Sequence, residues 1–496
     1  MKKTRCSGIL LHISSLPSPY GIGNLGREAY NFIDFLQKAG QAFWQILPTN
    51  PTSYGDSPYQ ALSAFAGNHY FIDLDELVSL GWLQEDDLSG DWGDCPAMVD
   101  FAIQFEKKTA VLRKAYAGFL KACPADFKEF CQKESAWLED YCLFRAIKNH
   151  FGGKSWQEWE DGAKYRQEES LKKYRKKLAG EMGFHRFLQY CFFRQWERLR
   201  TYAHKRGVKI IGDIPIYVPL DSADVWANPE KFQLNRKLKP KVIAGCPPDV
   251  FNRDGQYWGH PIYDWDYMEE NHFQWWMQRI AGAARLYDVI RIDHFRGIES
   301  YFAIPGRNKT ARVGEWIPGP GMKLVEKIRE TFPDTEFIAE DLGFLTDDVR
   351  QLVRDSGFPG MKVLEFAFDE DTRNEYLPHH YGENFVCYTG THDNDTLAHW
   401  ICERTEKQME FLCEYLNLRE GDDVRLAMLE AGLESRAVWF VALIQDWLSL
   451  DGSARMNEPG KALPTNWRWR MLPEAATDEL AAQIRQMTTE AERVAE

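Results

Sequence analysis

Short apolar runs alternate with helix-like amphipathic stretches along most of the chain. Eight runs have the length and composition of buried strands; they span residues 8–13, 42–48, 208–218, 288–295, 336–341, 361–368, 384–390 and 439–445. After the first run, apolar residues recur at i, i+3, i+4 and i+7 from Ala29 to Leu36, and Gly40 offers a C-cap. Eight parallel strands joined by crossover helices are the pattern of a β/α barrel. The sequence therefore predicts an α/β fold with a single (β/α)8 TIM barrel over residues 1–496.

Two stretches between the predicted strands are too long to be simple turns. Residues 60–207 are rich in Lys, Glu and Trp and carry helical patterns, so we expect a mainly helical insertion. Residues 219–285 contain many Pro, Gly, Asp and Trp residues and predict a loop-rich insertion over the active-site mouth of the barrel. Residues 446–496 are too few for a C-terminal β-sandwich domain of about 100 residues.

Composition and charge narrow the possible partners. The 74 acidic and 60 basic residues give a net charge of −14, which disfavours nucleic acid as a partner. No C-x-x-C pair occurs among the ten cysteines, so we expect no metal site of that kind. The sequence has neither an apolar span of about 20 residues nor a signal-like start, which predicts no membrane association and a cytoplasmic location. The oligomeric state cannot be read from the sequence.

A glycine pattern near the start resembles a dinucleotide-binding fingerprint. Gly21, Gly23 and Gly26 have the spacing G-x-G-x-x-G, but residues 14–20 separate them from the preceding strand. The second strand ends in Pro48 and not in the acid that would hold a ribose. We therefore interpret the glycines as turn residues and expect no cofactor. An NAD-dependent enzyme is the distant alternative, and a cofactor titration would detect it.

Acidic residues recur at the ends of the predicted strands. Strict alternation in 288–295 places Arg291 and Asp293 on one face. The next run ends with Glu340 and Asp341, and the segment that contains Asp393 directly follows the seventh run. Catalytic groups of such barrels lie at the C-terminal rim, and acids from neighbouring strands indicate a cationic transition state, as in glycosyl transfer. The alternative is a structural Arg291–Asp293 ion pair with Glu340 capping a helix.

The segments that carry these acids are similar to a known family. RIDHFRG, FIAEDLG and TGTHDND resemble the conserved regions of the 4-α-glucanotransferases called amylomaltases or disproportionating enzymes, in glycoside hydrolase family 77 of the α-amylase clan. Further segments, including LPSPYGIGNLG, PPDVFNRDGQYWGHPIYDW, ARMNEPG and NWRWR, resemble family segments in family order, so the resemblance covers nearly the whole chain.

The resemblance implies a role for each matching residue. Asp293 would be the nucleophile, Glu340 the general acid/base and Asp393 the third acid that stabilises the transition state. Arg291 would keep Asp293 ionised. The implied substrate-binding residues are Tyr59, Ser57, Asp213, Asp249, Gln256, Trp258, Arg291, His392 and Asn466.

Several of these residues have a simpler interpretation. Ser57 and Asp213 could be turn residues, His392 a satisfied rim histidine and Trp258 part of the core. The resemblance implies a retaining enzyme that moves α-1,4-glucan segments from a donor malto-oligosaccharide to the 4-hydroxyl of an acceptor, without metal or cofactor. An α-1,4-glucan hydrolase with the same acids and a noncatalytic glucan-binding protein are the alternatives.

Overall fold

Eight parallel strands form the central sheet of the protein. The structure is a computed structural model that describes residues 4–53, 55–248, 253–343 and 345–494. The sheet has the order β10-β11-β12-β1-β2-β3-β6-β9. Its strands are β1 (Cys6–Leu10), β2 (Phe43–Gln45), β3 (Lys209–Pro215), β6 (Val289–Asp293), β9 (Glu336–Ala339), β10 (Gly360–Val363), β11 (Phe385–Tyr388) and β12 (Trp439–Leu443).

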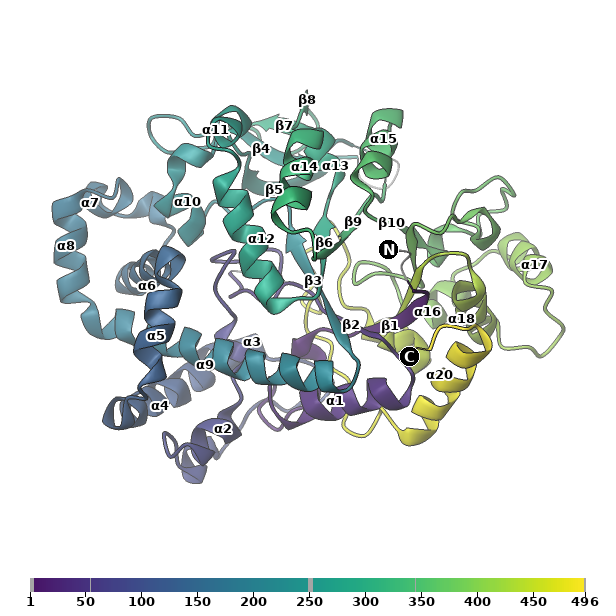
Figure 1. Ribbon diagram of the computed structural model, residues 1–496, viewed down its shortest axis with the longest axis horizontal. Helices are drawn as coiled ribbons and strands as arrows, with labels where there is room; N and C mark the ends of the chain where they lie inside the picture. Colours follow the sequence, from purple (N-terminus) through teal and green to yellow (C-terminus); the bar gives the residue numbers. More distant parts are fainter. Residues whose placement is uncertain (1–3, 54, 249–252, 344, 495–496) are drawn as a thin grey trace.

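The two edge strands of this sheet approach each other and nearly close it into a barrel (Figure 1). The Ala339 amide at the end of β9 donates a hydrogen bond of 2.9 Å to the Pro359 carbonyl just before β10. Each of the eight predicted apolar runs contains or overlaps one of these strands, so the TIM-barrel prediction is confirmed. The connection from β10 to β11 departs from the regular pattern, because its described residues form only 3-10 turns between the two strands.

Helices surround the barrel and fill the long insertions. They are α1 (Arg27–Lys38), α2 (Leu74–Ser79), α3 (Phe101–Ile103), α4 (Thr109–Ala122), α5 (Asp126–Lys133), α6 (Ser135–His150), α7 (Asp161–Lys164), α8 (Glu168–Lys177), α9 (Ala179–Lys205), α10 (Ala223–Ala227), α11 (Trp265–Glu270), α12 (Gln274–Leu286), α13 (Arg296–Glu299), α14 (Met322–Thr331), α15 (Asp347–Ser356), α16 (Leu397–Cys402), α17 (Glu406–Tyr415), α18 (Val424–Glu434), α19 (Ile444–Trp447) and α20 (Asp478–Glu490). Helix α1 buries its predicted apolar face, and Gly40, with a φ of 70°, follows its end.

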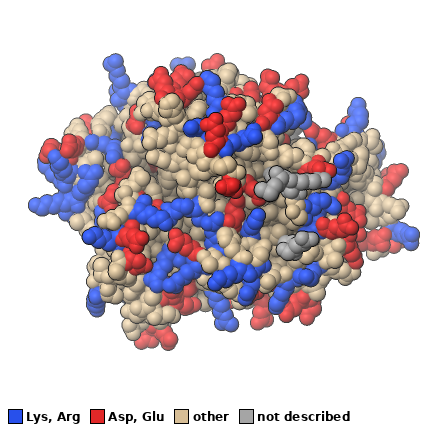
Figure 2. Space-filling model, in the orientation of Figure 1, with Lys and Arg blue, Asp and Glu red and all other residues tan. Residues whose placement is uncertain are grey.

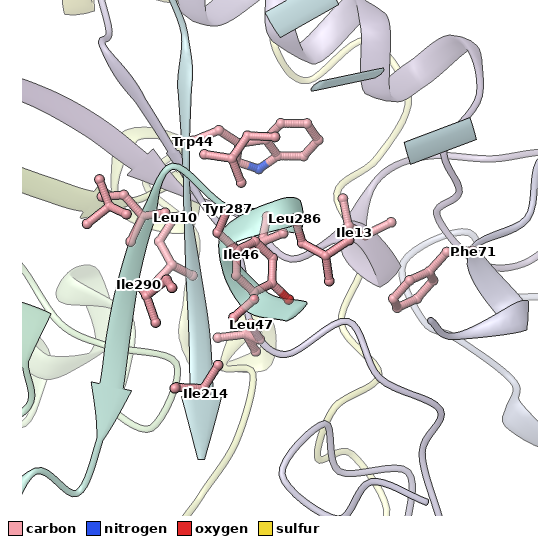
Figure 3. Packing of buried hydrophobic residues seen from close by; sticks show 14 of the residues in the cluster. Leu10, Ile13, Trp44, Ile46, Leu47, Phe71, Ile214, Leu286, Tyr287 and Ile290 are labelled. Atoms are coloured by element: carbon pink, nitrogen blue, oxygen red, sulfur yellow. The ribbon is translucent and has the colours of Figure 1, made fainter. Parts of the chain in front are cut away.

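The core lies between the barrel strands and the helices that cover them. Figure 3 shows Leu10, Trp44 and Ile290, from three strands of the barrel, packed with other buried side chains. Trp44 is fully buried, its ring meets Phe32 of α1 edge-on at 5.2 Å, and its indole N–H donates to the Leu11 carbonyl at 2.8 Å. The indole therefore joins a strand to its covering helix without leaving its polar atom unpaired.

Residues 60–207 contain the helices α2 to α9 between β2 and β3. Most of these helices lie to one side of the barrel, at the left in Figure 1. The last of them, α9, is 27 residues long and also packs against β3, so it serves both the insertion and the barrel.

Residues 219–285 differ from the expected run of loops. They hold three helices, α10 to α12, and two strands, β4 (Val242–Cys246) and β5 (Gln256–Pro261). These strands join β7 (Ser300–Pro305) and β8 (Glu315–Pro318) in a second, antiparallel sheet of order β5-β4-β7-β8. Their sequences contain Gly and Pro and lack a clear alternation, and pairing with a segment more than fifty residues away stabilises them. This sheet lies above the β3–β6 side of the barrel in Figure 1.

The glycines of the G-x-G-x-x-G pattern lie in a buried loop after β1. Gly21 has a φ of 73°, which a residue with a side chain rarely adopts. A Cβ on Gly23 would lie 1.8 Å from the Ile13 carbonyl oxygen, so only glycine fits there. The loop needs these glycines for its turn and its close packing.

The chain after β12 returns along the outside of the barrel. Helix α20 packs against α1 (Figure 1), and no strand follows β12 in residues 444–494. No helix in the described part of the chain is long and apolar enough to cross a membrane.

Candidate active site

Three of the predicted site residues lie on two neighbouring strands at one rim of the barrel. Asp213 of β3 pairs in register with Arg291 of β6, and Asp293 is the last residue of β6. Glu340 follows β9, the next strand in the sheet, whose last residue Ala339 pairs with Ile292. Asp293 and Glu340 therefore occupy equivalent positions on adjacent parallel strands, at the carboxyl end where barrel enzymes carry their catalytic groups.

Arg291 connects two of these carboxylates. Its Nη1 donates to Asp213 Oδ2 at 2.6 Å and to Asp293 Oδ1 at 3.0 Å. The arginine and Asp213 side chains are 5% and 1% exposed, whereas the Asp293 side chain is 27% exposed and so partly accessible to solvent. The alternation that placed Arg291 and Asp293 on one face is thus confirmed. Arg291 also forms an ion pair with Asp213, a partner on the neighbouring strand that alternation within one strand did not reveal.

The carboxylates around Asp293 change its protonation. Burial and the charges of Asp213, Glu340 and Asp393 raise the pKa of Asp293, and Arg291 opposes the rise without cancelling it. The resemblance implied that Arg291 would keep Asp293 ionised, whereas in the structure burial and the charges of three neighbouring carboxylates oppose the effect of the Arg291 guanidinium on the pKa of Asp293.

Glu340 is held by backbone amides. Its Oε2 accepts a hydrogen bond from the His294 N–H at 2.6 Å, and its Oε1 accepts one from the Leu342 N–H at 2.8 Å. Burial raises the pKa of Glu340 above its ordinary value, and Arg291 and these two amides oppose the rise without cancelling it. His294 has a φ of 52°, so the turn after β6 directs its amide toward Glu340.

Asp393 enters the pocket from a more distant strand than expected. It follows β11, which β10 separates from β9, so the three acids do not come from consecutive strands. Asp393 Oδ1 accepts from Asn457 Nδ2 at 2.7 Å and lies 3.3 Å from His392 Nε2. The Asp393 side chain is 43% exposed and thus open to a ligand.

Tyr59, His392 and Trp467 form an aromatic group beside the acids. The rings of Tyr59 and His392 stack at 5.0 Å, and Trp467 lies 5.9 Å from Tyr59 and 5.8 Å from His392. The Tyr59 hydroxyl donates to Asp213 Oδ2 at 2.7 Å, and burial raises its pKa well above the ordinary value. Burial lowers the pKa of His392, so the ring is neutral at pH 7 and carries a single proton.

The other predicted binding residues have different positions relative to the acids. Trp258 of β5 lies near the acids, because its ring meets His294 edge-on at 4.8 Å and its indole N–H donates to Gln256 at 3.1 Å. Ser57 accepts from the Tyr59 amide at 3.2 Å and supports the turn that carries Tyr59. Asn466 bonds to its own loop, at the Glu458 amide and the Lys461 carbonyl, and makes no described contact with the acids. Asp249 lies outside the described residues.

The sequence analysis missed three residues of this pocket: Asn457, Trp467 and Arg455. The Arg455 guanidinium donates to the Asp393 carbonyl at 2.7 Å and to the Asn457 carbonyl at 2.9 Å. All three lie in or beside ARMNEPG and NWRWR, segments that resembled the family but held no strand pattern. Among the described residues, no group of three or more His, Cys, Asp or Glu side chains has the arrangement of a metal site.

Comparisons with known proteins agree on one family. The sequence model of the family described as 4-alpha-glucanotransferase matches residues 11–475. The chain belongs to this family. The 4-alpha-glucanotransferase of Clostridium butyricum is 48% identical over 96% of this chain and 99% of its own, and that of Thermus thermophilus is 45% identical over the whole of both chains.

A solved structure of the 4-alpha-glucanotransferase family has nearly the same fold. The amylomaltase from Streptococcus agalactiae in complex with acarbose has a TM-score of 0.96 and 43% identity, covering 99% of this chain and 100% of its own. The amylomaltase from Corynebacterium glutamicum, at 18% identity and a TM-score of 0.79, shares the fold. In Figure 2 basic and acidic side chains are both spread over the visible face.

Proposed function

We propose that this protein is a retaining 4-α-glucanotransferase that acts on malto-oligosaccharides and α-1,4-glucans by double displacement. The observation that carries the proposal is that Asp293 and Glu340 occupy equivalent positions on adjacent strands, with Arg291 bonded to Asp293. Tyr59 bonds to Asp213 and stacks on His392, which contacts Asp393, so the third acid lies beside the same group. Family membership supports the reaction, and the acarbose complex of the Streptococcus agalactiae amylomaltase supports the substrate class. A cytoplasmic location stays a prediction.

In the first step, Asp293 attacks the anomeric carbon of the donor glucan while Glu340 protonates the departing glycosidic oxygen. The C–O bond to the leaving oligosaccharide breaks as the bond to the Asp293 carboxylate forms, which gives a covalent glucosyl-enzyme. Asp293 and Glu340 occupy equivalent positions on adjacent strands, which brings both residues to the same rim of the barrel.

The proton has to be on Glu340 before this step begins. Both Glu340 oxygens accept amide hydrogen bonds, which favour the ionised form. Arg291 contacts Asp293 directly and favours negative charge there. Burial nevertheless raises the pKa of Glu340 above its ordinary value, which favours the protonated form that the first step needs.

The second step reverses the roles of the same groups. Glu340, now a base, takes the proton from the 4-hydroxyl of the acceptor glucan, which attacks the glucosyl-enzyme and releases Asp293. Two inversions retain the anomeric configuration. Asp393 accepts hydrogen bonds from donor hydroxyls and stabilises the cationic transition state, with Tyr59 as the stacking surface for the donor sugar.

Trp258 supports an acceptor position on the Glu340 side of the pocket. Its ring contacts His294, whose amide holds Glu340, so a sugar packed on Trp258 would lie close to the general base. An acceptor sugar at this position excludes water from the glucosyl-enzyme and favours transfer over hydrolysis.

Incubation with maltotriose tests the proposal. We expect glucose and longer malto-oligosaccharides together, and a loss of more than about 1,000-fold in Asp293→Asn and Glu340→Gln. Asp478→Asn, an exposed residue of α20 paired with Lys38, is a matched control that should keep full activity. Reducing ends without longer products would identify a hydrolase, and turnover unchanged in Asp293→Asn would refute the catalytic role of this acid.

A further inference from the structure

Asp393 is held by a loop that lies far from it in the sequence. The loop follows a 3-10 turn at Gly452–Ala454 and carries Arg455 and Asn457. Arg455 donates to the main-chain carbonyl of Asp393 at 2.7 Å and lies 3.4 Å from the Asp395 carboxylate, so it fixes the backbone. Asn457 donates to the Asp393 carboxylate itself.

The contact between Asn457 and Asp393 is short and sheltered. Asn457 Nδ2 lies 2.7 Å from Asp393 Oδ1, and Asn457 is only 9% exposed, whereas the Asp393 side chain is 43% exposed. His392 Nε2 approaches the same oxygen at 3.3 Å. Among the described residues, no hydrogen bond to Oδ2 of Asp393 is found, so the carboxylate presents this second oxygen to the pocket.

The amide of Asn457 is neutral, and this property matters for a cationic transition state. An amide N–H orients an ionised carboxylate without cancelling its charge. A lysine or arginine at this position would form an ion pair with Asp393 and weaken its attraction for the oxocarbenium-like sugar. The residue type at position 457 therefore suits a carboxylate that has to remain oriented and uncompensated.

We propose that Asn457 is a positioning residue for the transfer reaction, which fixes the rotamer of Asp393 and leaves Oδ2 free for the donor sugar. This inference rests on the proposed function. Asn457 acts on the reaction through Asp393 and is thereby distinct from the predicted sugar-binding residue Asn466, whose side chain bonds to its own loop.

The variant Asn457→Asp should change the pH dependence of the reaction, which replacement of a residue with a purely structural role would not do. The new side chain has nearly the same shape, and in its protonated form it can still donate to Asp393. Two carboxyl groups at hydrogen-bond distance hold one proton between them more tightly than either would alone. As the pH rises, that proton is lost, the two carboxylates repel each other, and Asp393 leaves its position.

We expect the pH profile of kcat for maltotriose to move in Asn457→Asp. Its activity should be highest on the acidic side and fall with rising pH, at a pH where the wild-type protein remains fully active. Asn457→Ala, which has no donor at any pH, should lose about 10- to 100-fold in kcat across the whole profile, the worth of a hydrogen bond to a charged group. KM should change less than kcat, because the orientation of Asp393 matters most in the transition state.

Asn384→Asp is the matched control, because Asn384 precedes β11 at the opposite end of the barrel and donates to the Phe358 carbonyl at 3.1 Å. Its pH profile should coincide with that of the wild-type protein. An Asn457→Asp profile parallel to wild type, or a fully active Asn457→Ala variant, would overturn the inference. Failure of the proposed function would appear differently, as a wild-type protein that makes no longer products from maltotriose.

Discussion

Replacement of Arg291 by glutamine tests how the pocket sets the charge on Asp293. The Arg291 Nη1 lies 3.0 Å from Asp293 Oδ1 and 2.6 Å from Asp213 Oδ2. Glutamine removes the positive charge and keeps a polar side chain that can donate one hydrogen bond. Without the guanidinium, the same burial and the same neighbouring carboxylates act on Asp293 unopposed, so its pKa should rise further.

The size of this shift follows from the distances. Two unit charges about 4 Å apart attract each other by about 4 kcal/mol at an effective dielectric constant of about 20, which corresponds to about 3 pKa units. Because the Asp293 side chain is 27% exposed, water screens part of this attraction, and we expect a rise of about 1 to 2 units. A nucleophile with a raised pKa is ionised only at higher pH. The acidic limb of kcat/KM should therefore move upward by the same amount.

The assay is the pH dependence of kcat/KM for maltotriose, measured with thermal unfolding of the same samples. Loss of a buried ion-pair partner costs about 3 to 5 kcal/mol of stability, so Arg291→Gln should unfold at a clearly lower temperature. Arg291→Lys keeps the charge and is the matched control, with an acidic limb near that of the wild-type protein. A folded Arg291→Gln protein whose acidic limb does not move would refute the reasoning.

Two further predictions concern Tyr59 and Glu365. Tyr59→Phe keeps the ring stack on His392 but loses the hydroxyl bond to Asp213, so its kcat/KM should fall about 10-fold. Tyr59→Ala loses the ring as well, so its kcat/KM should fall further. Equal losses in the two variants would contradict separate roles for the ring and the hydroxyl. Glu365 is buried, and burial raises its pKa well above 4.5, so the native state holds a proton there and stability decreases as the pH rises above about 4.5. Glu365→Gln should therefore gain about 1 to 3 kcal/mol in the free energy of unfolding relative to wild type between pH 5 and pH 8, measured by urea denaturation; a constant difference would contradict this.

The barrel strands and the acids of β6 and β9 were readable from the sequence because their signals are local. A strand covered on both sides by the barrel core and the helices is a continuous apolar run, and all eight runs became strands. Alternation within one strand also placed Arg291 and Asp293 together. The family resemblance supplied the roles, and the comparisons support the family.

The second sheet and the loop behind Asp393 were not readable, because their partners are distant in the sequence. Strand β4 pairs with β7, and Asn457 bonds Asp393 from 64 positions away. Trp467 reaches Tyr59 from the other end of the chain. Nothing in the composition of these segments indicates where they pack, since their local patterns contain Gly, Pro and isolated polar residues that fit loops equally well.

The charge balance of the pocket was also not readable, and it explains why the acids are arranged as they are. Arg291 contacts Asp213 and Asp293, whereas Glu340 is held by backbone amides and Asp393 by the neutral Asn457. Neutral donors fix the direction of a carboxylate and leave its field intact. A pocket built in this way has excess negative charge until a positive charge develops on the sugar ring. In the proposed reaction, the negative charge that raises the pKa of Asp293 in the resting protein would be balanced by the positive charge of the transition state, so the pocket would bind the transition state more tightly than the substrate.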